Sequence, residues 1–78
     1  MEIGGVKYSF QTASDIVRDG LGFECYCEVD GKQTLVLEVF RNDGKNSFEV
    51  SQYINELPLE LYEYVISKAR GELGNFVP

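Results

Sequence analysis

Histidine is absent from this chain of 78 residues, and only two cysteines are present. Histidine is the commonest general base and the commonest metal ligand, so neither role has its usual side chain here. Ser-His-Asp and Cys-His catalytic arrangements are impossible within one chain, as are zinc sites that mix cysteine with histidine. We therefore expect no catalytic residues, no bound metal and no cofactor.

Positive charge is also scarce, since seven Lys and Arg stand against 13 Asp and Glu for a net charge of -6. The basic residues are scattered along the chain and form no run. Nucleic-acid backbones and anionic lipid headgroups attract basic stripes or clusters, so neither nucleic acid nor a membrane is expected as a partner. An acidic surface is better suited to a protein that carries a basic patch.

Long apolar runs are missing too. No segment approaches the ~20 apolar residues that span a bilayer, and residues 1–5 lack the basic and apolar regions of a signal peptide. These absences predict a cytoplasmic location. The length allows a single domain over residues 1–78, and a content of 44% apolar and 13% aromatic residues favours a packed fold. Residues 75–78 are expected to form a loose tail.

Alternation of apolar and polar residues indicates an antiparallel sheet in the first two thirds of the chain. Residues 6–11 have the period of a half-buried strand, placed at the sheet edge or beside the strands that follow. Thr12 and Asp15 form a weakened capping box, which predicts a short helix that Gly20 and Gly22 end. Three further strands, separated by Asp-Gly turns, predict a meander.

Matching the apolar faces of neighbouring strands fixes the expected turn lengths. The first turn of the meander must hold an odd number of residues, and a three-residue loop at 30–32 places Glu24 opposite Glu38. A two-residue type I′ turn at 43–44 places Glu38 opposite Glu49. Both turns leave one apolar sheet face available for a helix.

An apolar stripe at four-residue spacing predicts a C-terminal helix. Pro58 suits its first position, and Gly74 suits the position after its end. The stripe consists of Leu61, Val65, Ala69 and Leu73. The predicted fold class is therefore α+β, in the order β-(short α)-β-β-β-α, with the helix packed on one face of an antiparallel sheet of three to four strands.

The two cysteines, Cys25 and Cys27, are separated by one residue. On a strand this spacing points both side chains to the same face. We interpret them as two small buried apolar residues in a reducing compartment. A soft-metal site completed by a second chain and a redox pair remain the alternatives.

The sheet face turned away from the helix gathers the residues most suited to a partner. Glu24, Glu38 and Glu49 would form a row across three strands, although like charges directly opposed destabilise a sheet. Such a row beside an exposed aromatic fits a partner-binding face, whereas a solvated face studded with charges is the ordinary alternative. The candidate partner-binding face consists of Glu24, Tyr26, Glu28, Val36, Glu38, Phe40 and Glu49.

Two functions follow from this face. The first hypothesis is a small acidic interaction or regulatory module of the adaptor, inhibitor, immunity or antitoxin type, acting on a protein with a basic patch. The second is a homodimer or larger homo-oligomer that buries Tyr26, Val36 and Phe40. An enzyme or metal protein is the least favoured class, because no constellation of reactive side chains is present.

Overall fold

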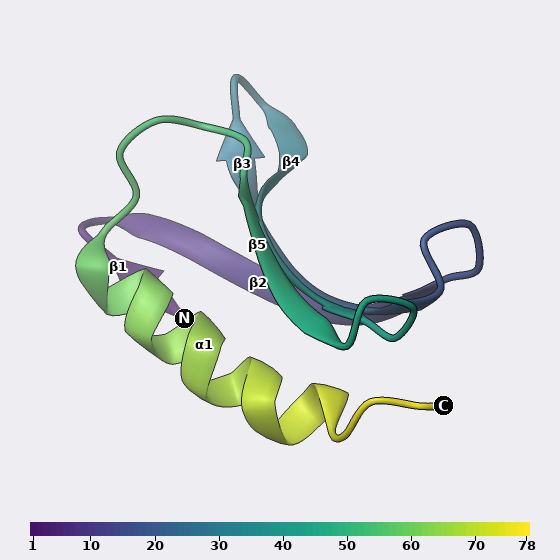
Figure 1. The fold of residues 1–78 in the computed structure, drawn as a ribbon. Helices are drawn as coiled ribbons and strands as arrows, with labels where there is room; N and C mark the ends of the chain where they lie inside the picture. Colours follow the sequence, from purple (N-terminus) through teal and green to yellow (C-terminus); the bar gives the residue numbers. More distant parts are fainter.

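The computed structural model describes all 78 residues as one curled antiparallel sheet with a helix across one face (Figure 1). The strands pair in sequence order, so the sheet is a simple meander. The predicted α+β class, with a C-terminal helix on one face of an antiparallel sheet, is confirmed, but the sheet has five strands rather than three to four. The elements are β1 (Glu2–Ile3), β2 (Val6–Asp15), β3 (Gly20–Val29), β4 (Lys32–Asn42), β5 (Ser47–Gln52) and α1 (Leu59–Leu73).

The additional strand, β1, lies at the N-terminus. Gly4 and Gly5 both have positive φ, which allows the tight turn that folds Ile3 back onto Val6. β2 then lies between β1 and β3, so of the two placements left open by the sequence, the sheet edge or beside the meander, it takes the second. Because β1 covers only the beginning of β2, most of the outer edge of β2 has no neighbouring strand.

The short helix predicted after Thr12 is wrong. The segment from Thr12 to Asp15 continues β2 and pairs with the start of β3. Asp15 caps a tight turn instead of a helix, since its Oδ1 accepts a hydrogen bond of 3.1 Å from the backbone N–H of Arg18. Asp19 closes that turn with a φ of 58°. The pairing of ten-residue strands outweighs the weak local preference for a helix.

The hairpin of β3 and β4 reaches its register through a β-bulge, not through the predicted three-residue turn. Asp30 and Gly31 form a two-residue turn with positive φ at both positions. On the side of the bulge nearer the turn, Tyr26 pairs with Leu35. On the other side, the next residue of β3, Cys25, pairs with Leu37, so Val36 is one extra residue on β4. The prediction that Val36 lies on the far face is therefore wrong, because the bulge turns it into the core.

The hairpin of β4 and β5 has a longer loop than predicted. Four residues, 43–46, connect the strands instead of two. The side chain of Asn42 accepts a hydrogen bond of 3.1 Å from the backbone N–H of Lys45, and Asn46 adopts a positive φ of 50°. The register moves by two residues, so each side chain of β5 keeps its predicted face although its partner on β4 changes.

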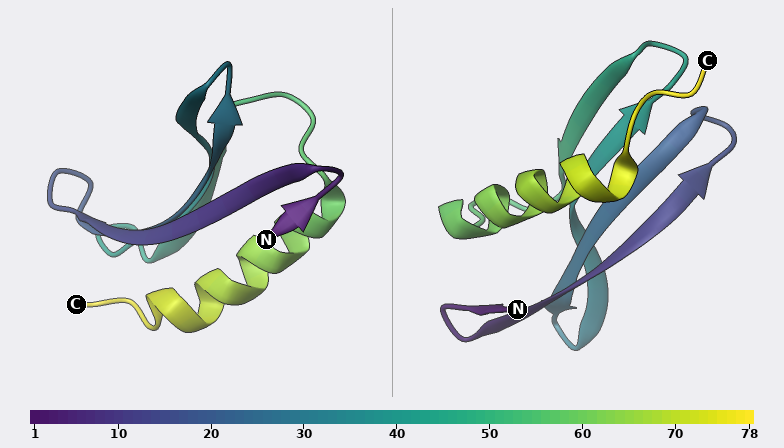
Figure 2. Two further views of the ribbon diagram at one scale, coloured as in Figure 1. Left: turned by 180° about the vertical axis from the view of Figure 1, so that it is seen from behind. Right: turned by 90° about the horizontal axis from the view of Figure 1, so that it is seen from below.

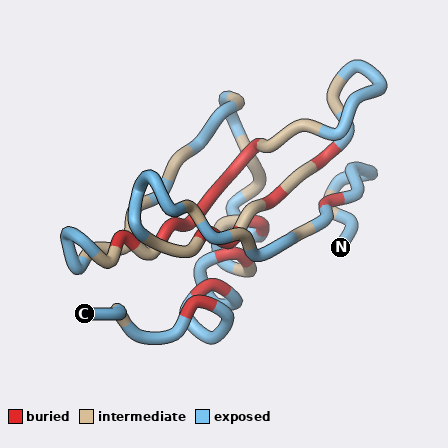
Figure 3. The backbone as a smooth tube through the Cα atoms, turned by 90° about the vertical axis from the view of Figure 1, so that its right-hand side faces the viewer, coloured by how far each residue is buried: buried red, intermediate tan, exposed pale blue.

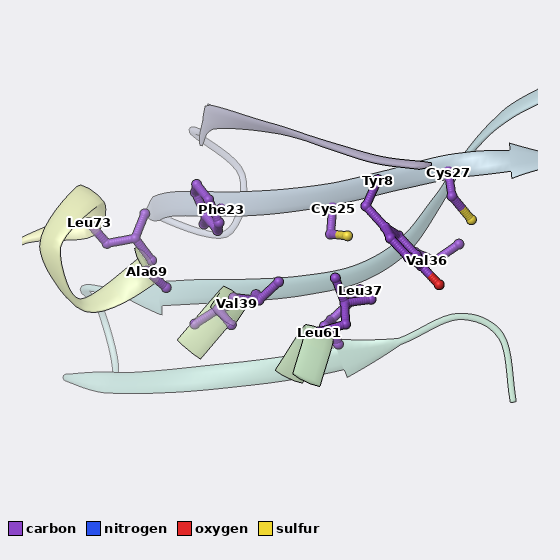
Figure 4. Packing of buried hydrophobic residues seen from close by; sticks show 11 residues of the cluster. Tyr8, Phe23, Cys25, Cys27, Val36, Leu37, Val39, Leu61, Ala69 and Leu73 are labelled. Atoms are coloured by element: carbon purple, nitrogen blue, oxygen red, sulfur yellow. The ribbon is translucent and has the colours of Figure 1, made fainter. Parts of the chain in front are cut away.

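The apolar stripe of α1 is confirmed, since all of its members are buried. Pro58 is the N-cap residue, one position before its predicted place, and Gly74 follows the last turn with a φ of 68°. α1 lacks the length and the continuous apolar sequence that crossing a membrane requires. Figure 4 shows the labelled members of the stripe, Leu61, Ala69 and Leu73, among the buried side chains of the sheet. The buried cluster consists of Tyr8, Phe23, Cys25, Cys27, Val36, Leu37, Val39, Leu61, Val65, Ala69 and Leu73.

The molecule is elongated, with extents of 41 × 22 × 18 Å (Figure 2). Burial is concentrated in the middle of the sheet and on one side of the helix, whereas the loops are exposed (Figure 3). At the C-terminus the ring of Phe76 lies 5.0 Å from that of Phe48, between centroids. This contact places the last residues against the outer part of the sheet.

Both cysteine thiols are free and buried in the core. Burial, and then the neighbouring Cys27, raise the pKa of Cys25 to about 11, and burial raises the pKa of Cys27 as well. We expect both thiols to resist alkylation by iodoacetamide at mildly alkaline pH, because the thiolate is the reactive form. Intact-mass measurement checks this, with the guanidinium-unfolded chain as control. Rapid modification of the folded protein would contradict the prediction.

Candidate functional site

The turn between β2 and β3 bends onto the sheet face opposite α1, where Arg18 closes over Glu38 and Phe40. Arg18 Nη1 and Nη2 donate hydrogen bonds of 3.0 and 2.9 Å to the two carboxylate oxygens of Glu38. The guanidinium carbon also lies 3.9 Å from the centroid of the Phe40 ring. This bidentate and cation–π contact holds the turn against the sheet. We call Asp15, Arg18, Glu38 and Phe40 the Arg18 latch.

Asp15 completes the latch from the other side of the guanidinium. Its Oδ2 accepts a hydrogen bond of 2.7 Å from Arg18 Nε. Hydrogen bonds from the side chain and then the backbone of Arg18 lower the pKa of Asp15. The hydrogen bonds to Glu38 and then to Asp15 raise the pKa of Arg18. One cation therefore serves two carboxylates, and the guanidinium has a fixed orientation.

Two glycines of β3 create the space in which the latch fits. A Cβ atom on Gly20 would lie 2.6 Å from Cζ of Phe40, and one on Gly22 would lie 2.7 Å from Oε2 of Glu38. Because neither glycine has a side chain, Phe40 and Glu38 lie close to the β3 backbone and are only 1% and 2% exposed. These glycines, which were expected to end a short helix, instead shape the sheet face.

Phe40 and Val36 are therefore not the exposed apolar residues that the sequence predicted. Phe40 is covered by the guanidinium of Arg18, and Val36 is fully buried in the core beneath α1. Both side chains already have their contacts within one chain. A homo-oligomer interface at Tyr26, Val36 and Phe40 would therefore lack most of the exposed apolar surface that it requires.

The predicted row of carboxylates is present only in part. Glu24 lies opposite Glu38, as predicted, but Glu38 is already bound by Arg18. Glu24 accepts hydrogen bonds of 3.0 Å from Gln11 Nε2 and 2.8 Å from the hydroxyl of Tyr26. The hydrogen bond to Glu24 raises the pKa of Tyr26. The two carboxylates are thus opposed, and each has its own donors: Gln11 and Tyr26 bind Glu24, and Arg18 binds Glu38.

The remaining two carboxylates lie apart from this pair. Glu49 is opposite Phe40 and not opposite Glu38, because the β4–β5 loop is longer than predicted. It accepts a hydrogen bond of 3.0 Å from Asn42 Nδ2 and forms an ion pair of 3.7 Å with Lys45. Glu28 lies near the β3–β4 turn and is exposed. The structure brings together Glu24, Tyr26, Glu38 and Phe40, with Glu49 beside Phe40 on the neighbouring strand, but not Glu28 or Val36.

The most exposed apolar residues of the chain lie at the end of the latched turn. Ile16 and Val17 are 94% and 96% exposed, and we call this pair the finger tip. The turn projects from one end of the sheet (Figure 1). Its other side is also held, because the backbone N–H of Asp43 donates a hydrogen bond of 2.9 Å to the carbonyl oxygen of Asp19. The finger tip is thus presented by a supported turn.

Sequence reasoning missed the finger tip because it assigned Ile16 and Val17 to a short helix. A signal was available in the residue types. Tight turns between strands favour Gly, Asn, Asp and Ser, whereas β-branched apolar residues there gain nothing from the turn geometry. Two such residues between two strands therefore predict a pair of exposed apolar side chains.

A second ion pair fastens the same end of the sheet to the C-terminal segment. Arg41 donates hydrogen bonds of 2.9 and 3.1 Å to the carboxylate of Asp43 and another to the carbonyl oxygen of Leu73 at the end of α1. The backbone N–H of Val77 donates to Asp43 over 3.0 Å. This hydrogen bond, followed by that from Arg41, lowers the pKa of Asp43. The loop beside the finger tip is therefore fixed to the helix.

The site is a supported projection beside a sheet face on which Glu24, Glu38 and Glu49 are hydrogen-bonded within the chain, and it is not a cleft. No group of three or more Cys, Asp or Glu side chains is arranged to hold a metal ion. The chain matches no protein-family model, no curated protein and no solved structure. The chemistry of its own residues therefore provides the basis for a function.

Proposed function

We propose that this protein is a small protein-binding module whose finger tip inserts into an apolar pocket of a partner protein. The observation that supports this most strongly is the nearly complete exposure of Ile16 and Val17 on a turn that Arg18 holds in place. Side chains that are exposed in the free protein and rigidly presented resemble the anchors of protein interfaces. A flexible loop would lose more conformational entropy on binding than this turn does.

The size of the finger tip is sufficient for a specific contact. Complete burial of one Val or Ile side chain contributes about 1.5–3 kcal/mol. Two such side chains therefore contribute about 3–6 kcal/mol before any polar contact is counted. The Arg18 latch supports this contribution, because it keeps the turn in one orientation relative to the sheet.

The charge near the finger tip favours a partner with basic side chains around its pocket. Asp19 is exposed next to the finger tip, and the whole chain carries a net charge of -6. Charges at the rim of an interface mainly accelerate association and select the partner. An adaptor, inhibitor, immunity protein or antitoxin working in the cytoplasm fits this chemistry, with no reaction catalysed by the chain itself.

Capture from cells that encode the protein, quantified by mass spectrometry, tests the finger tip. We expect the doubly substituted Ile16→Ser/Val17→Ser protein to lose the captured partner, with an affinity for the purified partner about 100-fold weaker, the equivalent of about 3 kcal/mol. Leu59→Ser is the matched control, because Leu59 is an exposed apolar residue on α1 away from this turn. It should leave the affinity unchanged.

Two measurements distinguish binding through the finger tip from binding through the net negative charge of the chain. If the finger-tip variant captures the same protein with the same affinity, the proposal is wrong. Asp19→Asn should lower the association rate constant more than it raises the dissociation rate constant, because a rim charge acts mainly during encounter. A change confined to dissociation would contradict the proposed basic rim.

A further inference from the structure

β5 is a terminal strand of the sheet, and one of its edges is free. The backbone N–H of Tyr53 donates a hydrogen bond of 2.9 Å to the carbonyl oxygen of Val36, which fixes the phase of the β4–β5 ladder. Bonded and non-bonded positions alternate in an antiparallel pair, so Ser51 and Glu49 bond to β4. The backbone groups of Phe48, Val50 and Gln52 therefore point away from the sheet.

This edge lacks the usual protection against pairing. Sheet edges are commonly blunted by proline, lysine, a bulge or a covering segment. The sequence of β5 contains no proline and no lysine, and no bulge interrupts its pairing with β4. α1 packs mainly over β3 and β4 and leaves the β5 side of the sheet open. The C-terminal segment reaches β5 through the ring of Phe76, which packs on that of Phe48, but no backbone hydrogen bond is made to the outer edge of β5. The backbone groups of the edge are therefore available for another strand.

Apolar surface lies directly beside the free edge. Val50 is 54% exposed and Ile66 is 47% exposed, although both lie on the side of the sheet that α1 occupies. Together with Phe48 they line an open groove of about 200 Å³ between β5 and α1. Arg70 reaches across this groove, with its guanidinium carbon 4.9 Å from the Phe48 ring. A strand added to β5 would cover part of this surface.

We propose that a second copy of this chain occupies the edge, with the two β5 strands antiparallel about a two-fold axis at Val50. The two sheets then become one continuous sheet, and both helices lie on the same side of it. The contact is isologous and closed, since each copy uses the same edge. The proposal does not depend on the finger tip, which belongs to a different strand connection.

The residues of β5 are self-complementary in this register and not in the neighbouring one. With the axis at Val50, Phe48 lies opposite Gln52 of the second copy, and Val50 lies opposite itself, so all the outward backbone groups of β5 find partners. On the other sheet face Glu49 lies opposite Ser51 of the second copy. An axis at Glu49 would oppose this carboxylate with itself, which is unfavourable. An axis at Ser51 would place Phe48 opposite Ile54, beyond the end of β5, so the axis at Val50 is the one that pairs all the outward residues of β5 with one another.

Sedimentation combined with amide hydrogen exchange tests the proposed dimer. At high protein concentration we expect a dimer in which the amides of Phe48, Val50 and Gln52 are protected, and dilution should remove that protection. The amides of Glu49 and Ser51 should stay protected throughout, because they bond to β4 within one chain. This alternation along one strand is the signature of edge pairing through β5.

Substitutions of Val50, the residue at the proposed two-fold axis, provide a matched pair of variants. Val50→Lys should weaken the dimer by at least about tenfold because two ammonium groups would meet there, whereas Val50→Thr retains a β-branched side chain and should still dimerise. Circular dichroism confirms that both variants are folded. The proposal is overturned if the protein stays monomeric with rapidly exchanging Phe48, Val50 and Gln52 amides, or if Val50→Lys dimerises like the unmodified chain. Open-ended growth with concentration would also overturn it, since that requires β5 to pair with a different edge.

Discussion

Gly20→Ala should destabilise the protein by about 3 kcal/mol, the upper end of the range for overpacked substitutions. A Cβ atom at this position would lie 2.0 Å from the carbonyl oxygen of Arg41 and 2.6 Å from Cζ of Phe40. The first of these atoms belongs to the backbone of the paired strand and cannot rotate away. β3 and β4 would have to separate where Gly20 pairs with Asn42. The free energy of unfolding in urea, obtained by linear extrapolation, measures the loss.

Gly71→Ala is the matched control for this substitution and should have the opposite sign. Gly71 lies inside α1, and nothing occupies the space that its Cβ atom would fill. Alanine in a helix is favoured over glycine by about 0.8–1.0 kcal/mol, so the variant should be slightly more stable than the unmodified protein. A Gly20→Ala variant as stable as the Gly71→Ala variant would show that the strands adapt and that Gly20 is not required for the latch.

Arg18→Met should destabilise the protein by about 2–3 kcal/mol. The substitution leaves Glu38 as a buried carboxylate without its cation, a change that costs about 3–5 kcal/mol in a fully buried pair. The lower figure is expected here because the side chain of Arg18 is 42% exposed, so water reaches the guanidinium side of the pair. Methionine retains an apolar stem over Phe40, so the measured loss reports mainly on charge.

A double-mutant cycle with Glu38→Met separates the ion pair from general packing. Removing both charges should be less harmful than the sum of the single substitutions, with a coupling free energy of about 1–3 kcal/mol from urea unfolding. Additive effects would indicate that Arg18 and Glu38 contribute independently, and the interpretation of the latch as one unit would fail.

The latch also predicts how stability depends on pH. Arg18 lowers the pKa of Asp15 in the folded protein, so the contribution of this pair is present above about pH 4 and is lost as the pH falls through the lowered value. The Arg18→Met variant lacks that contribution. Its stability should therefore decline less steeply than that of the unmodified protein below about pH 4.

Short-range periodicity predicted the parts of the fold that depend on one segment at a time. The stripe from Leu61 to Leu73 is buried as predicted, because a helix repeats its face every three to four residues whatever it packs against. The shared face of Cys25 and Cys27 follows in the same way from the two-residue period of a strand. These predictions need no knowledge of the rest of the chain.

The features that the sequence predicted wrongly or not at all depend on contacts between distant residues or on one specific side-chain hydrogen bond. The β4–β5 loop is four residues long because the Asn42 side chain binds the backbone of Lys45, which alternation along the strands does not reveal. The Arg18 latch joins a turn to Glu38, 20 residues away. The pairing of Glu24 with Glu38 was predicted correctly, but from a three-residue turn that does not exist.

The bulge at Val36 has a consequence for the lengths that this hairpin can tolerate. An inserted residue usually inverts every side chain beyond it, because the period of a strand is two. Here Tyr26 pairs with Leu35 on one side of the bulge and Cys25 pairs with Leu37 on the other, and the two would be successive pairs of a regular hairpin if Val36 were absent. Val36 is therefore an extra residue that the pairing on either side accommodates, and its side chain lies in the core. A chain without it would keep both registers and lose only one buried valine, so β4 can change length at this residue without inverting either sheet face.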